Sequence, residues 1–188
     1  MPTTADPTAT IALASRLESG ERERLLAAVL SLRDQERARG AVWSERTTSA
    51  INAIVGTLEA CARQEKSEAS LVDKLAAAGE LRPSYLLSAL KQKRLSVFRA
   101  ALVKLGGFTP DQVREALNAP ERPEILALAC VAVGIDKAAF STLLTAVREL
   151  NAGRPGGGDA GARRALGVFG SFSPDAAARA FAQVTGAV

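Results

Sequence analysis

Five basic side chains that could bind an anion or an acidic surface are concentrated in one short stretch of the chain. Residues 67–107 hold three acidic and seven basic residues, whereas acids and bases balance in residues 1–66 and 108–188. This stretch therefore accounts for the whole net charge of +4. The side chains that we select as candidate partner-binding residues are Lys91, Lys93, Arg94, Arg99 and Lys104.

A basic cluster of this kind has three interpretations. The cations could contact the phosphates of nucleic acid or another polyanion, they could attract an acidic protein surface, or they could be a solvated helix end favoured by the helix dipole. Only Tyr85 and Phe98 are aromatic residues near the cluster in sequence, and Phe98 belongs to an apolar stripe, so stacking platforms for bases are missing. We therefore favour a protein partner over nucleic acid.

The chain contains no histidine, and this excludes several classes of chemistry. A Ser-His-Asp or Cys-His nucleophile pair and a His-ligated zinc or iron site cannot be assembled within it. The acidic residues of 21–36 alternate with arginines, as is typical of a solvated, salt-bridged helix face. The glycine-rich segment 153–158 lacks the Gly-Lys-Ser/Thr ending of a phosphate loop, so we interpret it as a flexible linker. We expect no catalytic residue, metal or cofactor; an enzyme that works without histidine is the remote alternative.

Cysteine usage and hydropathy bear on the cellular compartment. Cys61 and Cys130 lie far apart without metal-ligand spacing, which favours two buried thiols in a reducing compartment. Residues 1–10 are rich in Thr, Ala and Pro and predict a disordered tail rather than a signal peptide. The longest uncharged apolar run, 125–135, is shorter than the about 20 residues that a membrane helix needs. We expect a cytoplasmic protein that does not enter the membrane.

The elements that position these residues are predicted to be helices throughout. Ala and Leu dominate the apolar positions and aromatic residues make up only 4%, a composition that favours an all-α fold. In residues 11–66 we predict a short helix near 11–17, a helix over 21–39 that ends at Gly40, and a helix from Ser44 to about Gln64. The two long helices should form an antiparallel hairpin.

The turn of this hairpin carries two apolar residues, Val42 and Trp43. Trp43 at such a place more often anchors packing than binds a ligand. The hairpin could also form a homodimer through residues 21–64, which would bury a second apolar edge that includes Val42 and Trp43. These two residues are therefore our dimerisation candidates.

Residues 67–188 contain an internal repeat. Leu81, Phe108 and Ile135 are spaced 27 residues apart and each precedes a helix start, and Phe172 begins a last half-unit. The units are 81–107, 108–134, 135–171 and 172–188. Matching positions on the first helix of each unit carry the same apolar stripe, which consists of Leu86, Val113 and Phe140, then Leu90, Leu117, Leu144 and Phe181.

Several local signals place the helices within the units. Thr109 and Ser173 are N-cap residues followed by proline, and Thr109 with Gln112 fits a capping box. The apolar segment 125–133 could be a buried strand, but its alanines and its place in the repeat favour a buried helix. We predict a short, irregular α-solenoid of HEAT-like helix pairs, with a globular helical bundle as the alternative.

Residues 70–150 resemble a bacterial family of uncharacterised proteins that is known only as a domain of unknown function. The resemblance rests on residues 81–90 (LRPSYLLSAL), 98–102 (FRAAL) and the Gly106-Gly107 stop. A third piece, residues 132–135, is similar to the family's alanine-glycine-leucine-proline step, but Asp136 replaces the proline. The resemblance implies a helical repeat in a bacterial cytosol and supplies no catalytic residue. Together these observations predict a non-enzymatic protein–protein interaction module, an adaptor or regulatory scaffold.

Overall fold

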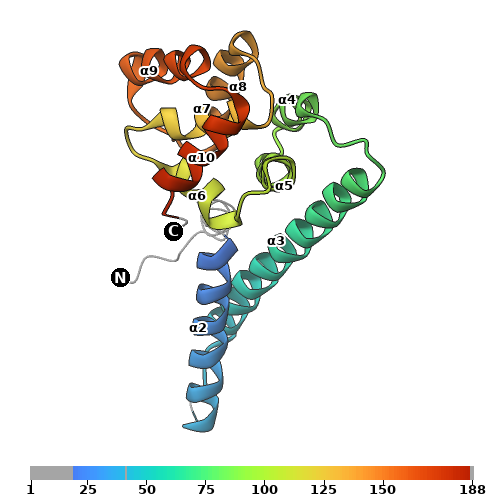
Figure 1. Ribbon diagram of the computed structural model, residues 1–188. Helices are drawn as coiled ribbons and strands as arrows, with labels where there is room; N and C mark the ends of the chain where they lie inside the picture. Colours follow the sequence, from blue (N-terminus) through green and yellow to red (C-terminus); the bar gives the residue numbers. More distant parts are fainter. Residues whose placement is uncertain (1–18, 41, 187–188) are drawn as a thin grey trace. The chain divides into compact units, whose positions relative to one another are not determined.

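The computed structural model describes residues 19–40 and 42–186, and all regular secondary structure in these ranges is helical (Figure 1). This confirms the all-α prediction. The predicted tail at 1–10 and the short helix at 11–17 lie outside the described residues. The chain divides into two compact units, Met1–Ser67 and Glu68–Val188, which we describe separately.

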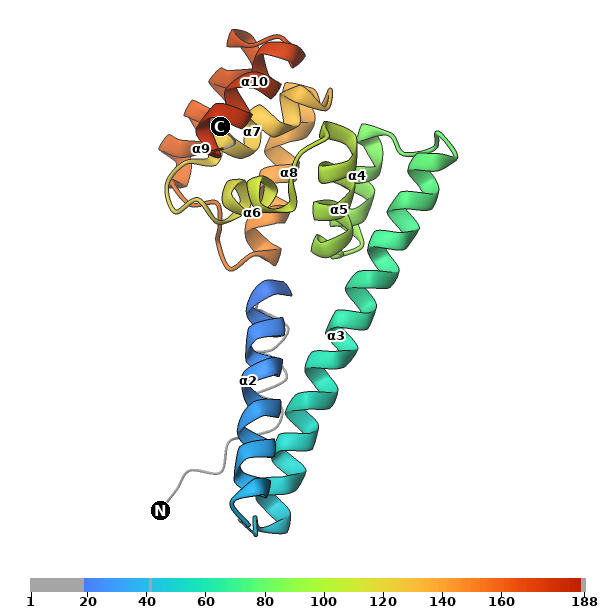
Figure 2. The same cartoon turned by 60° about the horizontal axis from the view of Figure 1, so that its bottom comes forward.

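The first unit contains a helical hairpin. Helix α2 (Ser19–Ala38) and the first part of α3 (Glu45–Ala77) run antiparallel (Figures 1 and 2). Gly40 turns the chain in the left-handed region, with φ 75°, and the Ser44 hydroxyl accepts the backbone N–H of Thr47 at 3.3 Å. An ion pair between Arg22 and Glu65 joins the two helices.

Helix α3 is longer than the sequence analysis predicted. It continues to Ala77, so the predicted end near Gln64 was wrong. Glutamates at positions 65 and 68 interrupt the apolar stripe there, but no glycine or proline ends the helix, and the stripe resumes at Val72 and Leu75. The predicted boundary between the hairpin (11–66) and the repeat region (67–188) therefore lies inside a continuous helix.

The interior of the hairpin is small. Val55 and Leu58 are the buried apolar side chains of the described part of the first unit. Leu25 and Leu32 of α2 are 39% and 55% exposed. Two helices alone offer each apolar stripe a single neighbour, so a part of each stripe stays in contact with solvent.

The second unit contains the repeat. Its helices are α4 (Pro83–Lys91), α5 (Leu95–Gly106), α6 (Pro110–Asn118), α7 (Pro123–Ala132), α8 (Lys137–Leu150), α9 (Gly158–Ser171) and α10 (Pro174–Val184). Helices α4, α6 and α8 begin 27 residues apart, as the sequence period predicts. The capping box of Thr109 with Gln112 is present, and Ser173 caps α10.

The apolar stripe residues predicted to match between the units are all buried, whereas of the anchor residues only Ile135 is buried and Phe172 is 38% exposed. The side chains at the first position are 0–1% exposed in Leu86, Val113 and Phe140, and those at the second position are 0–3% exposed in Leu90, Leu117, Leu144 and Phe181. Segment 125–133 is a helix with seven consecutive buried residues, Ile125–Val131, which confirms the helical interpretation. In residues 19–40 and 42–186, no helix combines the length and the apolar character that crossing a membrane requires.

The helix pairs meet around α7. This helix packs most extensively against α9 and α10 and also contacts its pair partner α6. Helix α4 contacts α8 as well as its own partner α5. Contacts thus join units that are not consecutive, in addition to the neighbour-to-neighbour contacts of a linear array. The HEAT-like character of the pairs stays a prediction.

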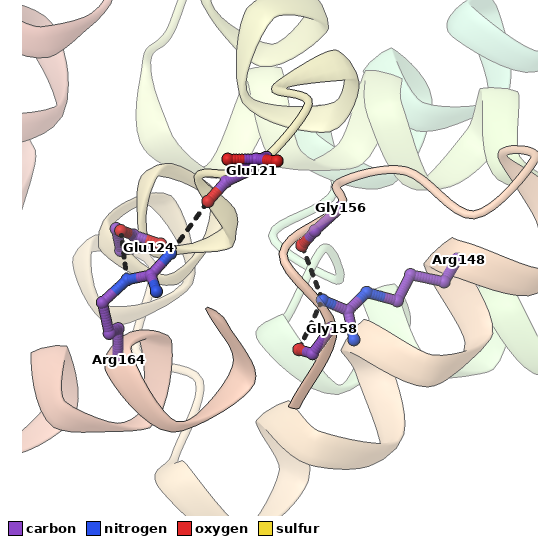
Figure 3. Close-up of polar contacts among 6 residues, drawn as sticks. All are labelled: Glu121, Glu124, Arg148, Gly156, Gly158 and Arg164. Atoms are coloured by element: carbon purple, nitrogen blue, oxygen red, sulfur yellow. Dashed lines mark hydrogen bonds and ion pairs between the residues drawn. The ribbon is translucent and has the colours of Figure 1, made fainter. Parts of the chain in front are cut away.

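The glycine-rich connection between α8 and α9 is anchored to the rest of the second unit. The guanidinium of Arg148 donates a hydrogen bond to the carbonyl of Pro155 at 2.8 Å. It also donates to the carbonyls of Gly156 at 2.7 Å and Gly158 at 3.4 Å (Figure 3). The Gly156 N–H donates to the carbonyl of Ala119 at 3.1 Å. Glycine is required at this position, because a Cβ atom on Gly156 would lie 1.8 Å from the carbonyl oxygen of Pro120. The prediction of a flexible linker was wrong.

A second arginine ties the α6–α7 connection to α9. Arg164 donates to the carbonyl of Glu121 at 2.9 Å and pairs with the carboxylate of Glu124 at 3.1 Å (Figure 3). The third predicted unit, 135–171, is longer than the two before it, and its extra residues lie partly in a helix and partly in the connection. Helix α8 has 14 residues, whereas α4 and α6 have nine.

Candidate functional site

Two of the five candidate cations are engaged inside the second unit. Arg94 Nη2 lies 3.2 Å from Glu68 Oε1, and Ser96 donates a hydrogen bond to the same carboxylate. Glu68 is only 4% exposed, so Arg94 neutralises a buried charge. Lys104 Nζ lies 2.8 Å from Asp73 Oδ1. Both acids belong to α3, so Arg94 and Lys104 each have a carboxylate partner within the second unit.

Lys91 and Lys93 remain available at the turn between α4 and α5. Both are exposed, and neither forms an ion pair with any residue that the structure describes. Lys93 adopts the left-handed conformation with φ 58°, and its N–H donates to the carbonyl of Leu90 at 2.9 Å. Arg99 lies farther along α5, where it is half-buried. The structure therefore brings together only two of the predicted residues.

These two lysines border a depression between α4 and α8, which we call the α4–α8 groove. Its volume is about 300 Å³. The residues that line it are Leu87, Leu90, Lys91, Lys93, Thr142, Ala146, Glu149 and Leu150. A shallower hollow of about 410 Å³ shares Thr142, Ala146 and Glu149 and adds Ser141 and Thr145, so the depression continues along α8.

The lining of the α4–α8 groove combines apolar surface with a few charged side chains. Its apolar surface comes from three leucines and an alanine, and its charges are two lysines from α4 and the following turn and one carboxylate from α8. In the described ranges, no three His, Cys, Asp or Glu side chains gather as a metal site would require. The arrangement can hold an amphipathic segment whose acids meet the lysines.

The α8 side of the groove was missed in the sequence. Thr142, Ala146 and Glu149 lie on one face of α8, opposite the buried stripe that contains Phe140 and Leu144. From sequence this face reads as an ordinary solvated surface. It becomes a groove wall only because α8 packs against α4, which belongs to a unit two repeats earlier.

The thiols differ in environment. Cys130 is fully buried in α7, as predicted, and burial raises the pKa of its thiol. Cys61 is half-buried on α3, so the expectation of a buried residue was only partly met. A thiol that stays protonated in an apolar core is a poor nucleophile, which makes Cys130 a packing residue.

The two dimerisation candidates sit at the hairpin turn of the first unit. Val42 is 96% exposed and Trp43 is half-buried. Trp43 lines a hollow between α2 and α3 rather than a closed core. Dimerisation through residues 21–64 stays a prediction.

Comparison with known proteins assigns the chain to a family. No curated protein and no solved structure matches it. The family model described as "Uncharacterised protein conserved in bacteria (DUF2336)" matches residues 3–182. The match extends well beyond the stretch 70–150 that carries the resemblance in the sequence, and it includes both the hairpin and the helical repeat. The chain therefore belongs to this uncharacterised bacterial family.

Proposed function

We propose that this protein is a non-enzymatic interaction module, an adaptor or regulatory scaffold, that binds an acidic segment of another protein in the α4–α8 groove. The observation that carries the proposal is the position of Lys91 and Lys93. They are cations without an internal carboxylate partner in the described structure, and they stand beside the apolar lining of a groove. An apolar surface with a charged rim is the usual anatomy of a protein-binding site.

The charge pattern of the groove specifies the partner's chemistry. Lys91 and Lys93 favour acidic side chains, whereas the carboxylate of Glu149 favours a polar or basic residue on the same segment. Leu87, Leu90 and Leu150 offer apolar surface to aliphatic or aromatic side chains between these charges. An amphipathic helix or extended segment with acidic residues at one end meets all three conditions.

Nucleic acid is the alternative occupant of the same surface, and the lining argues against it. No aromatic side chain lines the described groove, so a base would find no stacking platform. Glu149 would repel a phosphate backbone that followed α8. Arg94 and Lys104, which could have extended a basic track, are already paired with acids of α3.

The helix pairs would act as a scaffold for this groove. We propose that they are HEAT-like repeats, which is supported by the 27-residue spacing of α4, α6 and α8 and by the burial of matching side chains. The absence of histidine from the sequence supports a role in binding rather than catalysis. The two widely spaced cysteines support a reducing compartment, and we propose the bacterial cytoplasm.

The proposal can be tested by covalent capture in cells. Thr142, an exposed residue of the groove, is replaced by a photo-cross-linking amino acid in the full chain. We expect one discrete protein adduct that survives nuclease digestion. The adduct should disappear in the Lys91→Glu/Lys93→Glu variant. It should persist in Lys74→Glu/Lys137→Glu, which changes the net charge equally at exposed lysines outside the groove.

Three outcomes would overturn the proposal. One is the absence of any discrete adduct, and another is equal loss of the adduct in both charge-reversal variants. The third is an adduct that vanishes on nuclease digestion together with binding that weakens steeply as salt rises, which would identify nucleic acid as the occupant.

A further inference from the structure

A second depression lies in the first unit, near the turn that joins α2 to α3. Its volume is about 370 Å³, within the size range of small-molecule sites. The residues that line it are Arg33, Arg37, Trp43, Thr48, Ile51 and Asn52. We call it the hairpin hollow. Two helices that face each other usually fill the space between them with apolar side chains, and here most of the lining is polar.

The two arginines bring only hydrogen-bond donors to the hairpin hollow, whereas Thr48 and Asn52 carry both donors and acceptors. The Thr48 hydroxyl already donates to the carbonyl of Ser44 at 3.2 Å. Arg33 and Arg37 lie one turn apart on α2, and Thr48 and Asn52 lie one turn apart on α3, so each helix presents a pair of polar side chains. No described acidic residue lines the hollow. A lining of this kind is complementary to a ligand rich in hydrogen-bond acceptors.

The two arginines differ in what already binds them. Arg33 Nε donates to the adjacent Asp34 at 3.4 Å, a long contact that leaves the terminal nitrogens of Arg33 for other acceptors. Arg37 forms no ion pair within the described ranges. The carboxylate of the neighbouring Glu36 pairs with Arg39 instead, at 3.0 Å. Arg37 is therefore the cation of the hollow whose charge is least compensated.

Trp43 and Ile51 give the hollow its apolar part. The indole of Trp43 is half-buried and lines the depression, where it offers a flat surface for stacking. A ligand that carries both an anionic group and a planar ring would satisfy the arginines and the indole together. Guanidinium groups bind phosphate in a two-pronged manner that a lysine cannot reproduce.

We propose that the hairpin hollow binds a nucleoside monophosphate, with the phosphate on Arg33 and Arg37 and the base stacked on Trp43. Thr48 and Asn52 hydrogen-bond to the sugar or the base. This site belongs to the first unit and the α4–α8 groove to the second, so either proposal can fail while the other stands.

Trp43 is the only tryptophan of the chain, and its fluorescence therefore reports on the hairpin hollow directly. The full-length protein is titrated separately with AMP, GMP, CMP and UMP, and with adenosine and inorganic phosphate as partial ligands. We expect saturable quenching by at least one nucleoside monophosphate. Adenosine and inorganic phosphate should each bind at least about tenfold more weakly, because each satisfies only part of the lining.

Two arginine variants complete the test. Arg37→Gln should weaken binding about tenfold or more, because it removes a charge-assisted hydrogen bond. Arg39→Gln removes the same charge from an exposed arginine that does not line the hollow, and it should leave affinity unchanged. Arg37 and Arg39 are both exposed, so the helicity of each variant, measured by circular dichroism, should match that of the parent protein. The proposal is overturned if no monophosphate quenches saturably, if inorganic phosphate binds as tightly, or if the two variants weaken binding equally.

Discussion

Glu68 and Arg94 form an ion pair in which the carboxylate is 4% exposed while the guanidinium reaches solvent. Glu68 belongs to α3, and Arg94 is the N-cap residue directly before α5. The pair joins the start of α5 to α3, and it gives one cation of the most basic stretch a carboxylate partner within the second unit.

The first prediction concerns this pair. Arg94→Ala should lower the free energy of unfolding of the second unit by about 1–3 kcal/mol, because it leaves a buried carboxylate with fewer donors. Lys104→Ala is the matched control, since its partner Asp73 is largely exposed, and it should cost less than about 1 kcal/mol. The free energies of unfolding of both variants are measured by urea unfolding, with labelling of the Cys130 thiol in a Cys61→Ser background as the probe. Equal costs for the two variants would contradict this interpretation.

The second prediction tests the position of the core in the second unit. Phe140 is fully buried at a matching position of the stripe, whereas Phe172, at an anchor position of the last half-unit, is 38% exposed. Phe140→Ala should lower the free energy of unfolding by about 3–5 kcal/mol through a cavity in the core. Phe172→Ala should cost clearly less, in the same urea experiment. A larger cost at Phe172 would mean that the core is not where the stripe places it.

The third prediction concerns pH. Burial raises the pKa of Cys130 far above the ordinary value of 9.0, so the native thiol keeps its proton while the unfolded chain releases it at alkaline pH. Above about pH 9 the unfolded state binds fewer protons, and stability should fall by about 1.4 kcal/mol for each further pH unit. Cys130→Ala should lack this component. If the free energies of unfolding of the parent and of Cys130→Ala change in parallel between pH 9 and 10, this prediction is wrong.

The fourth prediction uses two glycines. Gly156→Ala places a Cβ against the carbonyl of Pro120 and should displace the α8–α9 connection, with a loss of more than about 2 kcal/mol. Gly167 lies inside α9 with nothing within 4 Å of an added Cβ, so Gly167→Ala should stabilise by about 0.5–1 kcal/mol. Thermal unfolding distinguishes the two. Tolerance of Gly156→Ala would show that the connection is not anchored as described.

Local signals explain what the sequence could predict. The capping box at Thr109, the N-cap at Ser173 and the glycine stops depend on a few adjacent residues, and all of them lie at helix ends in the structure. The apolar stripe is equally local, because each helix needs one buried face whatever it packs against. These local features are enough to predict how many helices each unit contains and which residues form the core.

Long-range contacts explain what the sequence could not predict. Glu68 and Asp73 lie far from Arg94 and Lys104 in the sequence, and nothing in their local pattern shows that they would pair with these cations. The groove wall formed by Thr142 and its neighbours depends on α8 meeting α4, a contact between non-consecutive units. The sequence therefore identified the basic stretch, but the structure decides which of its cations face solvent.

The central claim is that Lys91 and Lys93 pair with acidic side chains of a protein partner in the α4–α8 groove. A charge-swap cycle tests it most directly, with the protein captured by cross-linking at position 142 as the ligand. Lys91→Glu/Lys93→Glu should weaken its binding, and replacing the partner's groove-facing acids by lysine should restore it, with a coupling energy of about 1.5 kcal/mol or more. The account is contradicted if the losses of binding free energy from the two sets of changes are additive, so that no acid-to-lysine change in the cross-linked segment restores binding.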